Sequence, residues 1–234
     1  MILDRALVWY DYLHEWLSGI NDFLLVLIGL AFSAQLIFII FFFVKKTVFP
    51  KAKKKHKFGI LICARNEADV IGNTVKEILT KQNYPKDLYD VYVVADNCTD
   101  NTAELAKKAG ATVFKRKDDD PSHHKLSYAL KYGFQEILKL NKGYECFIRF
   151  DADNIPDANF IDVMNDAFES GVECARCLEN SSNINQNNIT KCMGLYYLRD
   201  CRLTSRVRER FHLDCMANGP GMMISANIIK RIDG

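Results

Sequence analysis

Two aspartates, Asp151 and Asp153, stand one residue apart in the stretch FDADNIP, between an apolar run and Pro156. The preceding ECFIRF has the aromatic and β-branched character of a buried strand, and proline cannot continue the ladder of a sheet. We therefore expect both carboxylates at the carboxyl end of a strand, where open α/β sheets bind ligands. Like charges this close repel unless a cation or hydrogen-bond donors neutralise them, and a divalent metal that carries a phosphate would do so. The alternative is a solvated turn.

Two further polar clusters follow predicted strands. ARNE, residues 64–67, comes after KFGILICA, and ADNCTD, residues 95–100, comes after DVYVVAD. A turn explains any one of the three clusters. Three clusters on one sheet edge favour a nucleotide-binding crevice.

The elements that must position these clusters form a regular series. From Phe58 onward, short apolar runs alternate with helical stretches, which predicts an α/β fold with a mostly parallel sheet and helices on its faces. We expect strands at KFGILICA, DVYVVAD, ATVFK, ECFIRF and VECARCL. We expect helices at about 65–82, 97–110, 126–140, 157–170 and 190–209.

An uncharged apolar block, 23–44, precedes this series. At about 1.5 Å per residue it spans roughly 33 Å, which is enough to cross a membrane. We predict a transmembrane helix over 23–44, an amphipathic interfacial segment over 1–22, a basic linker over 45–57 and a catalytic domain over 58–234. The linker is either solvated or attracted to anionic lipid headgroups. Its basic residues are Lys45, Lys46, Lys51, Lys53, Lys54, Lys55 and Lys57.

This charge distribution also predicts the orientation. Acidic residues dominate before the apolar block and lysines follow it, so the positive-inside bias places the amino terminus outside and the domain in the cytoplasm, at the cell membrane. The formal net charge of +2 says little about nucleic acid, and we expect no nucleic-acid partner. Of the eight cysteines only Cys174 and Cys177 form C-x-x-C, without further ligands at zinc spacing, so we expect free, mostly buried thiols.

Four segments in this order and spacing resemble the family-2 glycosyltransferases with the GT-A fold: ILICARNEADVIGNTV, VVADNCTDNTAELAKKAGATV, FIRFDADNIPDANFI and NGPGMMIS. The likeness runs from Phe58 to the end of the chain and is closest to the membrane-bound subgroup. It implies a Rossmann-like nucleotide-sugar-binding domain that takes a UDP-sugar donor and inverts the anomeric carbon. It further implies a saccharide or lipid-linked acceptor, in polysaccharide or glycolipid synthesis.

The resemblance also implies roles for individual residues. Asp96 would hydrogen-bond the uracil edge, and the alternative role of a cap for the helix that starts near Thr99 suits Asn97 better than Asp96. Asp153 would bind Mg²⁺ or Mn²⁺ directly, and Asp151 would contact the metal through water or contact the ribose. Lys125 opens a helix and would face the diphosphate. The remaining nucleotide-pocket residues would be Ala64, Arg65, Asn66 and Glu67, and the acceptor-side residues would be Asn218, Gly219 and Gly221.

Other polar residues fit the resemblance less well. His123 and His124 are interpreted mainly as loop residues, and the aspartates at 118–120 as a solvated loop away from the metal. The glycine segment has the alternative of an ordinary tight turn at Pro220.

The resemblance stops short at the carboxyl terminus. The family's E-D motif, which supplies the catalytic base, and its Q-x-x-R-W segment do not follow Gly221, and Glu209 and Asp214 are poor substitutes because both precede the glycine segment. The catalytic base is therefore left unassigned, and we expect a truncated member of the family. Two alternatives remain open: a catalytically incomplete nucleotide-binding membrane scaffold, and a nucleotidyltransferase.

Overall fold

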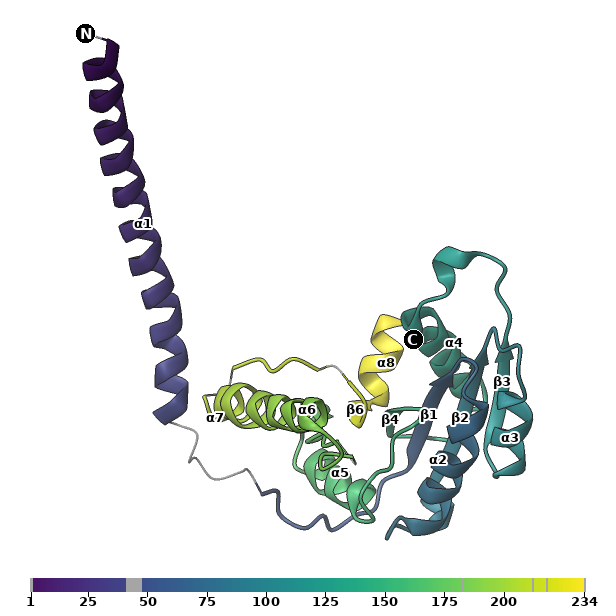
Figure 1. Cartoon of the computed structure of the whole chain (residues 1–234). Coiled ribbons are helices and arrows are strands. Elements are labelled where there is room, and N and C mark those ends of the chain that lie inside the picture. Colours follow the sequence, from purple (N-terminus) through teal and green to yellow (C-terminus); the bar gives the residue numbers. More distant parts are fainter. Residues whose placement is uncertain (1, 41–47, 182, 212, 218, 234) are drawn as a thin grey trace. The chain divides into compact units, whose positions relative to one another are not determined.

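The computed structural model describes residues 2–40, 48–181, 183–211, 213–217 and 219–233. The chain divides into two compact units. One comprises Met1–Thr47 and Ser181–Cys215, and the other comprises Val48–Asn180 and Met216–Gly234. The second unit contains the sheet and is the α/β domain (Figure 1).

The α/β domain is built on a six-stranded sheet in the order β3-β2-β1-β4-β6-β5. The four strands from β3 to β4 are parallel, and β6 runs antiparallel to both of its neighbours. This arrangement confirms the predicted α/β class and the mostly parallel sheet. The strands are β1 Phe58–Ala64, β2 Tyr89–Asp96, β3 Thr112–Arg116, β4 Cys146–Asp151, β5 Cys174–Arg176 and β6 Met222–Ser225.

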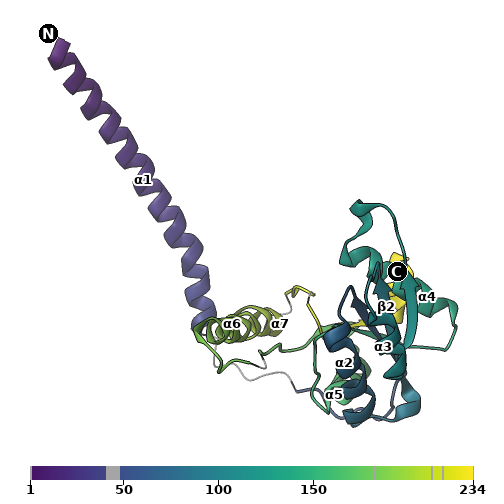
Figure 2. The same ribbon diagram turned by 45° about the vertical axis from the view of Figure 1, so that its right-hand side comes forward.

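Helices cover both faces of this sheet (Figures 1 and 2). Side chains alternate along a strand, so Ile60 and Ile62 of β1 point to one face and Leu61 points to the other. The first face packs against α2, α3 and α5, and the second against α4 and α8. The helices are α2 Ala68–Lys81, α3 Thr102–Lys108, α4 Leu126–Lys139, α5 Phe160–Glu169 and α8 Ala226–Ile232, with short 3₁₀ turns η2 Lys86–Leu88 and η3 Pro121–His123.

The register of the parallel strands brings the three polar clusters together. Ala64 pairs with Ala95 at the ends of β1 and β2, and Cys63 pairs with Asp151 at the end of β4. All three strands therefore finish at one edge of the sheet, and each is followed by one of the clusters. The predicted shared edge is confirmed.

The sequence analysis missed β6 and α8. β6 is only four residues long, and it is a strand because it pairs with β4 on one side and β5 on the other. Since β6 is antiparallel to β4, the chain enters it at the carboxyl end of β4. Ser225 then caps α8 by accepting a hydrogen bond from the Ile228 N–H at 3.3 Å.

The described part of the basic linker, residues 48–57, belongs to the α/β domain. Lys51 lies 3.1 Å from Asp162 and 2.9 Å from Asp166, and Lys55 pairs with Asp162 as well. Lys54 lies 2.9 Å from Glu145. These three lysines are therefore not simply solvated, because they hold the segment on α5 and on the residue before β4. Lys45 and Lys46 lie outside the described residues.

His56 fastens the same segment at its end. Its Nδ1 lies 2.9 Å from Glu145 and its Nε2 lies 2.6 Å from Glu169, and the ring is buried edge-on against Phe168. Its backbone N–H donates to Asn165 Oδ1 at 2.9 Å, and its carbonyl accepts from the Tyr84 hydroxyl at 2.7 Å. The chain thus enters β1 from a fixed position.

The other unit is helical. Its first helix, α1, covers Ile2–Ile40, and the part of it long and apolar enough to span a membrane is Tyr12–Ser33. The predicted boundary at residue 22 falls inside this continuous helix, and residues 41–44 of the predicted span lie outside the described residues. The predicted helix over 190–209 is present as α6 Asn188–Arg199, a π-helical segment η4 Asp200–Ser205 and α7 Arg206–Arg210.

Candidate functional site

The ends of β1 and β2 are tied to each other by hydrogen bonds. Asn66 takes a positive φ of 56° and its Oδ1 accepts from the Thr99 N–H at 2.8 Å. The Glu67 N–H donates to Thr102 Oγ1 at 2.8 Å. These bonds fix the loops that follow the two strands, and Ala64, the last residue of β1, is buried.

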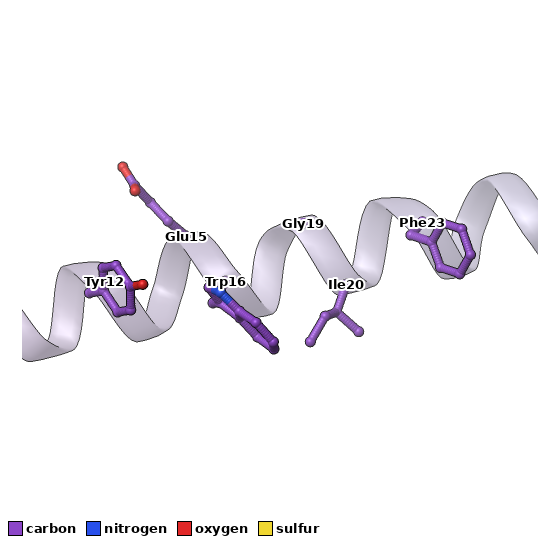
Figure 3. Close-up of a pocket in the computed structure, with 6 residues that line it drawn as sticks. All are labelled: Tyr12, Glu15, Trp16, Gly19, Ile20 and Phe23. Carbon is purple, nitrogen blue, oxygen red and sulfur yellow. The ribbon is translucent and has the colours of Figure 1, made fainter.

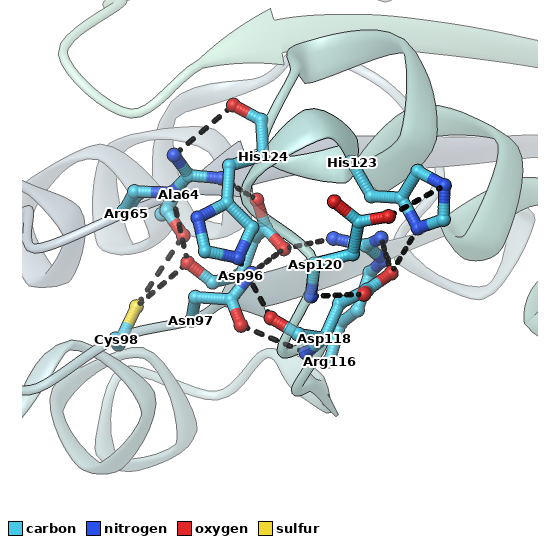
Figure 4. Close-up of polar contacts among 10 residues, drawn as sticks. All are labelled: Ala64, Arg65, Asp96, Asn97, Cys98, Arg116, Asp118, Asp120, His123 and His124. Atoms are coloured by element: carbon cyan, nitrogen blue, oxygen red, sulfur yellow. Dashed lines mark hydrogen bonds and ion pairs between the residues drawn. The ribbon is translucent and has the colours of Figure 1, made fainter.

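Asp96 is a buried carboxylate at the centre of this edge (Figure 4). Its Oδ2 accepts from Arg65 Nη2, and its Oδ1 accepts from Arg116 Nη1 at 2.6 Å. The Nδ2 group of Asn97 also donates to Oδ1, at 2.9 Å. Two guanidinium groups therefore flank the carboxylate, one from the end of β1 and the other from the end of β3.

The N-cap residue of α3 is Asn101, and Asp100, which precedes it, accepts hydrogen bonds at the starts of α3 and α2. Asp100 Oδ1 accepts from the Thr102 N–H at 3.0 Å, and Asp100 Oδ2 accepts from the Ala68 N–H at 3.2 Å. The hydrogen bond from the Thr102 hydroxyl is the main cause that lowers the pKa of Asp100. Since Asp100 serves the helix starts, the alternative role of Asp96 as a cap is not seen.

The loop after β3 is ordered by the same cluster, which differs from the solvated loop expected for 118–120. Asp118 Oδ2 lies 2.5 Å from Arg116 Nη2 and 3.1 Å from His123 Nδ1. His124 Nε2 donates to the Asp118 carbonyl at 2.7 Å, and its own carbonyl accepts from Arg65 at 3.2 Å. The hydrogen bond from the Asp120 N–H, followed by that from His123, lowers the pKa of Asp118 against the opposing effect of burial. Figure 4 shows these contacts.

Hydrogen bonds fix the turn that contains Asp151 and Asp153. Asn154 Oδ1 accepts from the Asp151 N–H at 2.8 Å, and its Nδ2 donates to Asp153 at 3.2 Å. The carbonyl of Ala152 accepts from Thr74 Oγ1 on α2 at 2.6 Å. Asp151 is half-buried at the end of β4, whereas Asp153 is exposed.

Asp151 has a partner that the sequence analysis did not foresee. The guanidinium of Arg149, two residues earlier on the same face of β4, donates to Asp151 Oδ1 through Nη2. Arg149 is buried. A side-chain cation therefore already supplies part of the neutralisation that we had assigned to a metal.

A divalent cation fits this turn only if a bound diphosphate supplies further oxygen ligands. Carboxylate oxygens suit Mg²⁺ and Mn²⁺, and one or two of them suffice when phosphate oxygens complete the coordination. Asp153 and Asp151 are such donors. Within the described ranges, no group of three or more His, Cys, Asp or Glu side chains could hold a metal on its own.

The remaining nucleotide-pocket candidate, Lys125, lies at the start of α4. It is exposed, and its carbonyl accepts from the Tyr128 N–H at 3.0 Å within the first turn. The helix start and the lysine both favour a nearby anion. The structure thus places Lys125 directly after the histidine loop that contacts Arg65.

The glycine segment lies beside β4, and Asn218 is outside the described residues. The Gly221 N–H donates to the Arg149 carbonyl at 2.7 Å. Gly219 and Gly221 both have positive φ, and a Cβ on Gly221 would come 2.3 Å from Cys177 Sγ. A Cβ on Gly219 would come 2.5 Å from Glu179 Oε1. Positive φ favours glycine at both positions, and the space at Gly221 is the tighter of the two because the Glu179 carboxylate near Gly219 is the end of a flexible side chain.

Arg116 and Arg149 are the two site residues that sequence reasoning missed. Arg149 carried a signal, because it is a charged residue inside a strand that is otherwise apolar and buried, whereas Arg116 ends a short strand with exposed residues and follows another basic residue, so nothing in the sequence marked it. A buried charge must be paired, and the nearest candidates were the acidic clusters at the same edge.

Residues 56–234 match the model of a protein family described as "Glycosyltransferase like family 2". Among solved structures, the chain is similar to the mannosyltransferase PcManGT from Pyrobaculum calidifontis in complex with GDP-Man and Mn²⁺, at 16% identity and a TM-score of 0.62. It is also similar to glucosyl-3-phosphoglycerate synthase from Mycobacterium tuberculosis, at 15% identity, with TM-scores of 0.51 for a UDP complex and 0.50 for one with Mn²⁺, UDP-Glc and phosphoglyceric acid. The search of curated proteins found no significant match.

These alignments cover most of this chain and a smaller share of each neighbour. The first covers 90% of this chain and 57% of PcManGT. The others cover 79% and 74% of this chain, and 65% and 58% of the mycobacterial synthase. At these identities the likeness establishes the GT-A fold.

Proposed function

The protein belongs to glycosyltransferase-like family 2, and we propose that it transfers a sugar from a UDP-sugar donor, with inversion, to a saccharide or lipid-linked acceptor at a membrane. The product would be a polysaccharide or a glycolipid. The observation that carries the proposal is the buried carboxylate of Asp96 between two guanidinium groups, on the same sheet edge as the Asp151–Asp153 turn.

The bonding of Asp96 favours uracil over guanine. Its Oδ1 already accepts two hydrogen bonds and its Oδ2 accepts one, so one acceptor position remains on the carboxylate. Uracil offers a single N–H between two carbonyl oxygens, which suits one acceptor flanked by the donors of Arg65 and Arg116. Guanine offers two adjacent donors and would leave one of them unpaired, which costs binding free energy.

The metal would be held by Asp153, with Asp151 beside it. When bound with the donor, Mg²⁺ or Mn²⁺ would offset the negative charge that develops on the departing diphosphate. Lys125 at the start of α4 adds a positive charge for the same diphosphate. Two of the similar solved structures contain Mn²⁺ together with GDP-Man or UDP-Glc, which supports a divalent cofactor here.

The acceptor would approach along the glycine segment. Gly219 and Gly221 lie next to β4 because the chain enters β6 at the carboxyl end of that strand. Inversion needs a general base that takes the proton of the acceptor hydroxyl. We assign no residue of this chain to that role.

We further propose that α1 anchors the enzyme, with the α/β domain in the cytoplasm. The segment Tyr12–Ser33 is long and apolar enough to span a membrane. A shallow pocket on this helix is lined by Tyr12, Glu15, Trp16, Gly19, Ile20 and Phe23, and Figure 3 shows Trp16 and Ile20 on one side with Glu15 turned to the other. Full-length protein should remain in the membrane pellet after alkaline carbonate washing. Release into the supernatant would overturn the anchor.

Calorimetric titration of the full chain in detergent tests the proposed donor. UDP with Mn²⁺ should bind in the micromolar range, and GDP with Mn²⁺ should bind at least about tenfold more weakly because of the unpaired guanine donor. Equal affinity for GDP would overturn the uridine assignment. Absence of metal-dependent binding to either nucleotide would favour the scaffold, and release of pyrophosphate from a nucleoside triphosphate and a sugar phosphate would identify a nucleotidyltransferase.

A further inference from the structure

Arg149 is an unusual residue for the middle of a sheet. β4 is flanked on both sides, by β1 and β6, and Arg149 pairs in register with Leu61 and Met222. The neighbours on its own strand, Ile148 and Phe150, are buried and apolar. A buried guanidinium in such surroundings destabilises the fold unless its charge has a partner.

The hydrogen bonds of this guanidinium are incomplete. Nη2 pairs with Asp151, but Nε is the one buried side-chain nitrogen or oxygen without a hydrogen-bond partner in the part of the chain that the structure describes. Buried donors are normally satisfied, so an orphan needs an explanation. At this position Arg149 gives Asp151 a hydrogen-bond partner, but its own Nε is left without one.

Asp151 and Asp153 therefore differ in charge environment although they share one turn. Asp151 has a buried cation beside it, whereas Asp153 is exposed and receives one hydrogen bond from Asn154. A cation approaching the turn meets one unpaired carboxylate and the field of a nearby positive charge. Both effects weaken metal binding in the absence of another anion.

We propose that Arg149 is a positioning residue that keeps Asp151 paired, so that a divalent cation binds this turn only together with the nucleotide diphosphate. The inference rests on the proposed function and adds an order of binding to it. The metal binds together with the donor and does not bind to the free protein. The diphosphate supplies the anionic oxygens that the turn lacks while Arg149 holds one of its two carboxylates.

The test measures Mn²⁺ binding to the full chain in detergent, with and without UDP. The electron paramagnetic resonance signal of free Mn²⁺ reports how much metal is bound. In the wild type, UDP should tighten Mn²⁺ binding by tenfold or more. Arg149→Met should tighten Mn²⁺ binding without nucleotide by about tenfold, because it frees Asp151 and removes a repelling charge. A residue with only a structural role would not produce this gain.

Two companion variants control the charge and the shape of the side chain. Arg149→Lys keeps the positive charge and should bind Mn²⁺ like the wild type. Arg149→Gln removes the charge but keeps a polar side chain, so it should show the same gain as Arg149→Met and replaces it if the methionine variant does not fold by circular dichroism.

The outcomes separate this inference from the proposed function. Wild-type protein that binds Mn²⁺ equally well with and without UDP, or folded Met and Gln variants that show no gain, would overturn the role of Arg149. Failure of the wild type to bind UDP under any metal condition would instead overturn the proposed function.

Discussion

Asp96 and Arg116 form a buried ion pair across the β2–β3 junction, with Oδ1 and Nη1 2.6 Å apart and both side chains less than a tenth exposed. The two residues are also direct register partners in the sheet. A pair this well buried is costly to break from one side, since the remaining charge loses its partner and cannot reach water. The same pair sits where we expect the nucleotide base.

Replacing Arg116 with Met should lower the free energy of unfolding by about 3 kcal/mol, because it leaves Asp96 buried beside one guanidinium instead of two. Urea unfolding measures the loss. Adding Asp96→Asn to this variant should restore at least half of it. Lys115→Met, at the exposed preceding position, should change stability by less than about 0.5 kcal/mol. A fully stable Arg116→Met protein would contradict the importance of the pair.

Asp153→Ala should abolish Mn²⁺-dependent UDP binding, a loss of tenfold or more in affinity, because the exposed carboxylate of the turn is removed. Titration calorimetry with and without Mn²⁺ checks this. Asp87→Ala is the matched control, since Asp87 is exposed in η2, just before the opposite end of β2. Retention of metal-dependent binding by Asp153→Ala would show that the metal is held elsewhere.

Gly221→Ala should cost about 3 kcal/mol of stability, since it combines a strained φ of 67° with a Cβ only 2.3 Å from Cys177 Sγ. Gly143→Ala provides the comparison. Its φ of 75° is similar but nothing lies within 4 Å of the added Cβ, so it should cost only about 1 kcal/mol. Thermal or urea unfolding of both variants isolates the steric contribution. Equal losses would mean that the Cys177 contact relaxes freely.

The docked linker should loosen at low pH. The hydrogen bond from Lys55, ahead of that from Lys51, lowers the pKa of Asp162 although burial opposes the shift. A lowered carboxyl pKa contributes stability above the unfolded value of about 3.9, and that contribution is lost as the pH falls through the folded value. Asp162→Asn should therefore be less stable than the wild type by about 0.5–1 kcal/mol at pH 6, with the difference shrinking as the pH falls below about 3.9. The exposed Asp119→Asn serves as control, and a pH-independent difference would contradict the ion pair.

Cys63 should resist alkylation in the folded protein. Burial, opposed by the charge of Arg149, raises the pKa of its thiol to about 12, and the thiolate is the reactive form. At pH 8, iodoacetamide should label the exposed Cys192 at least about tenfold faster than Cys63, as measured by mass spectrometry of peptides. In urea both cysteines should react at similar rates. Comparable rates without urea would show that the end of β1 is open to solvent.

The part of the fold that could be predicted is the part with local signals. The apolar runs of β1, β2 and β4, together with the polar residues that follow them, are enough to place Asp96 and Asp151 at one edge of the sheet. Alternation between strands and amphipathic helices also predicts the parallel sheet, because strands and helices differ in the period of their apolar residues.

What was missed depends on contacts between distant segments. β6 has four residues and no period of its own, and it becomes a strand only between β4 and β5. The lysines of the linker look like any solvated basic run until α5 presents Asp162 to them. The pairing of Arg149 with Asp151 is different, because the two residues are only two positions apart, and their contact was missed although a buried charge in an apolar strand needs a partner.

The reversed direction of β6 has a consequence for how such an enzyme could diversify. Because β6 is antiparallel to β4, the connection that enters β6 lies at the same edge of the sheet as the connections that leave the four parallel strands β1, β2, β3 and β4. On the proposed function, the leaving connections hold the donor and the entering one faces the acceptor. Insertions ahead of Gly219 could then alter acceptor range while the donor-holding loops keep their lengths, so the two halves of substrate choice are free to evolve separately.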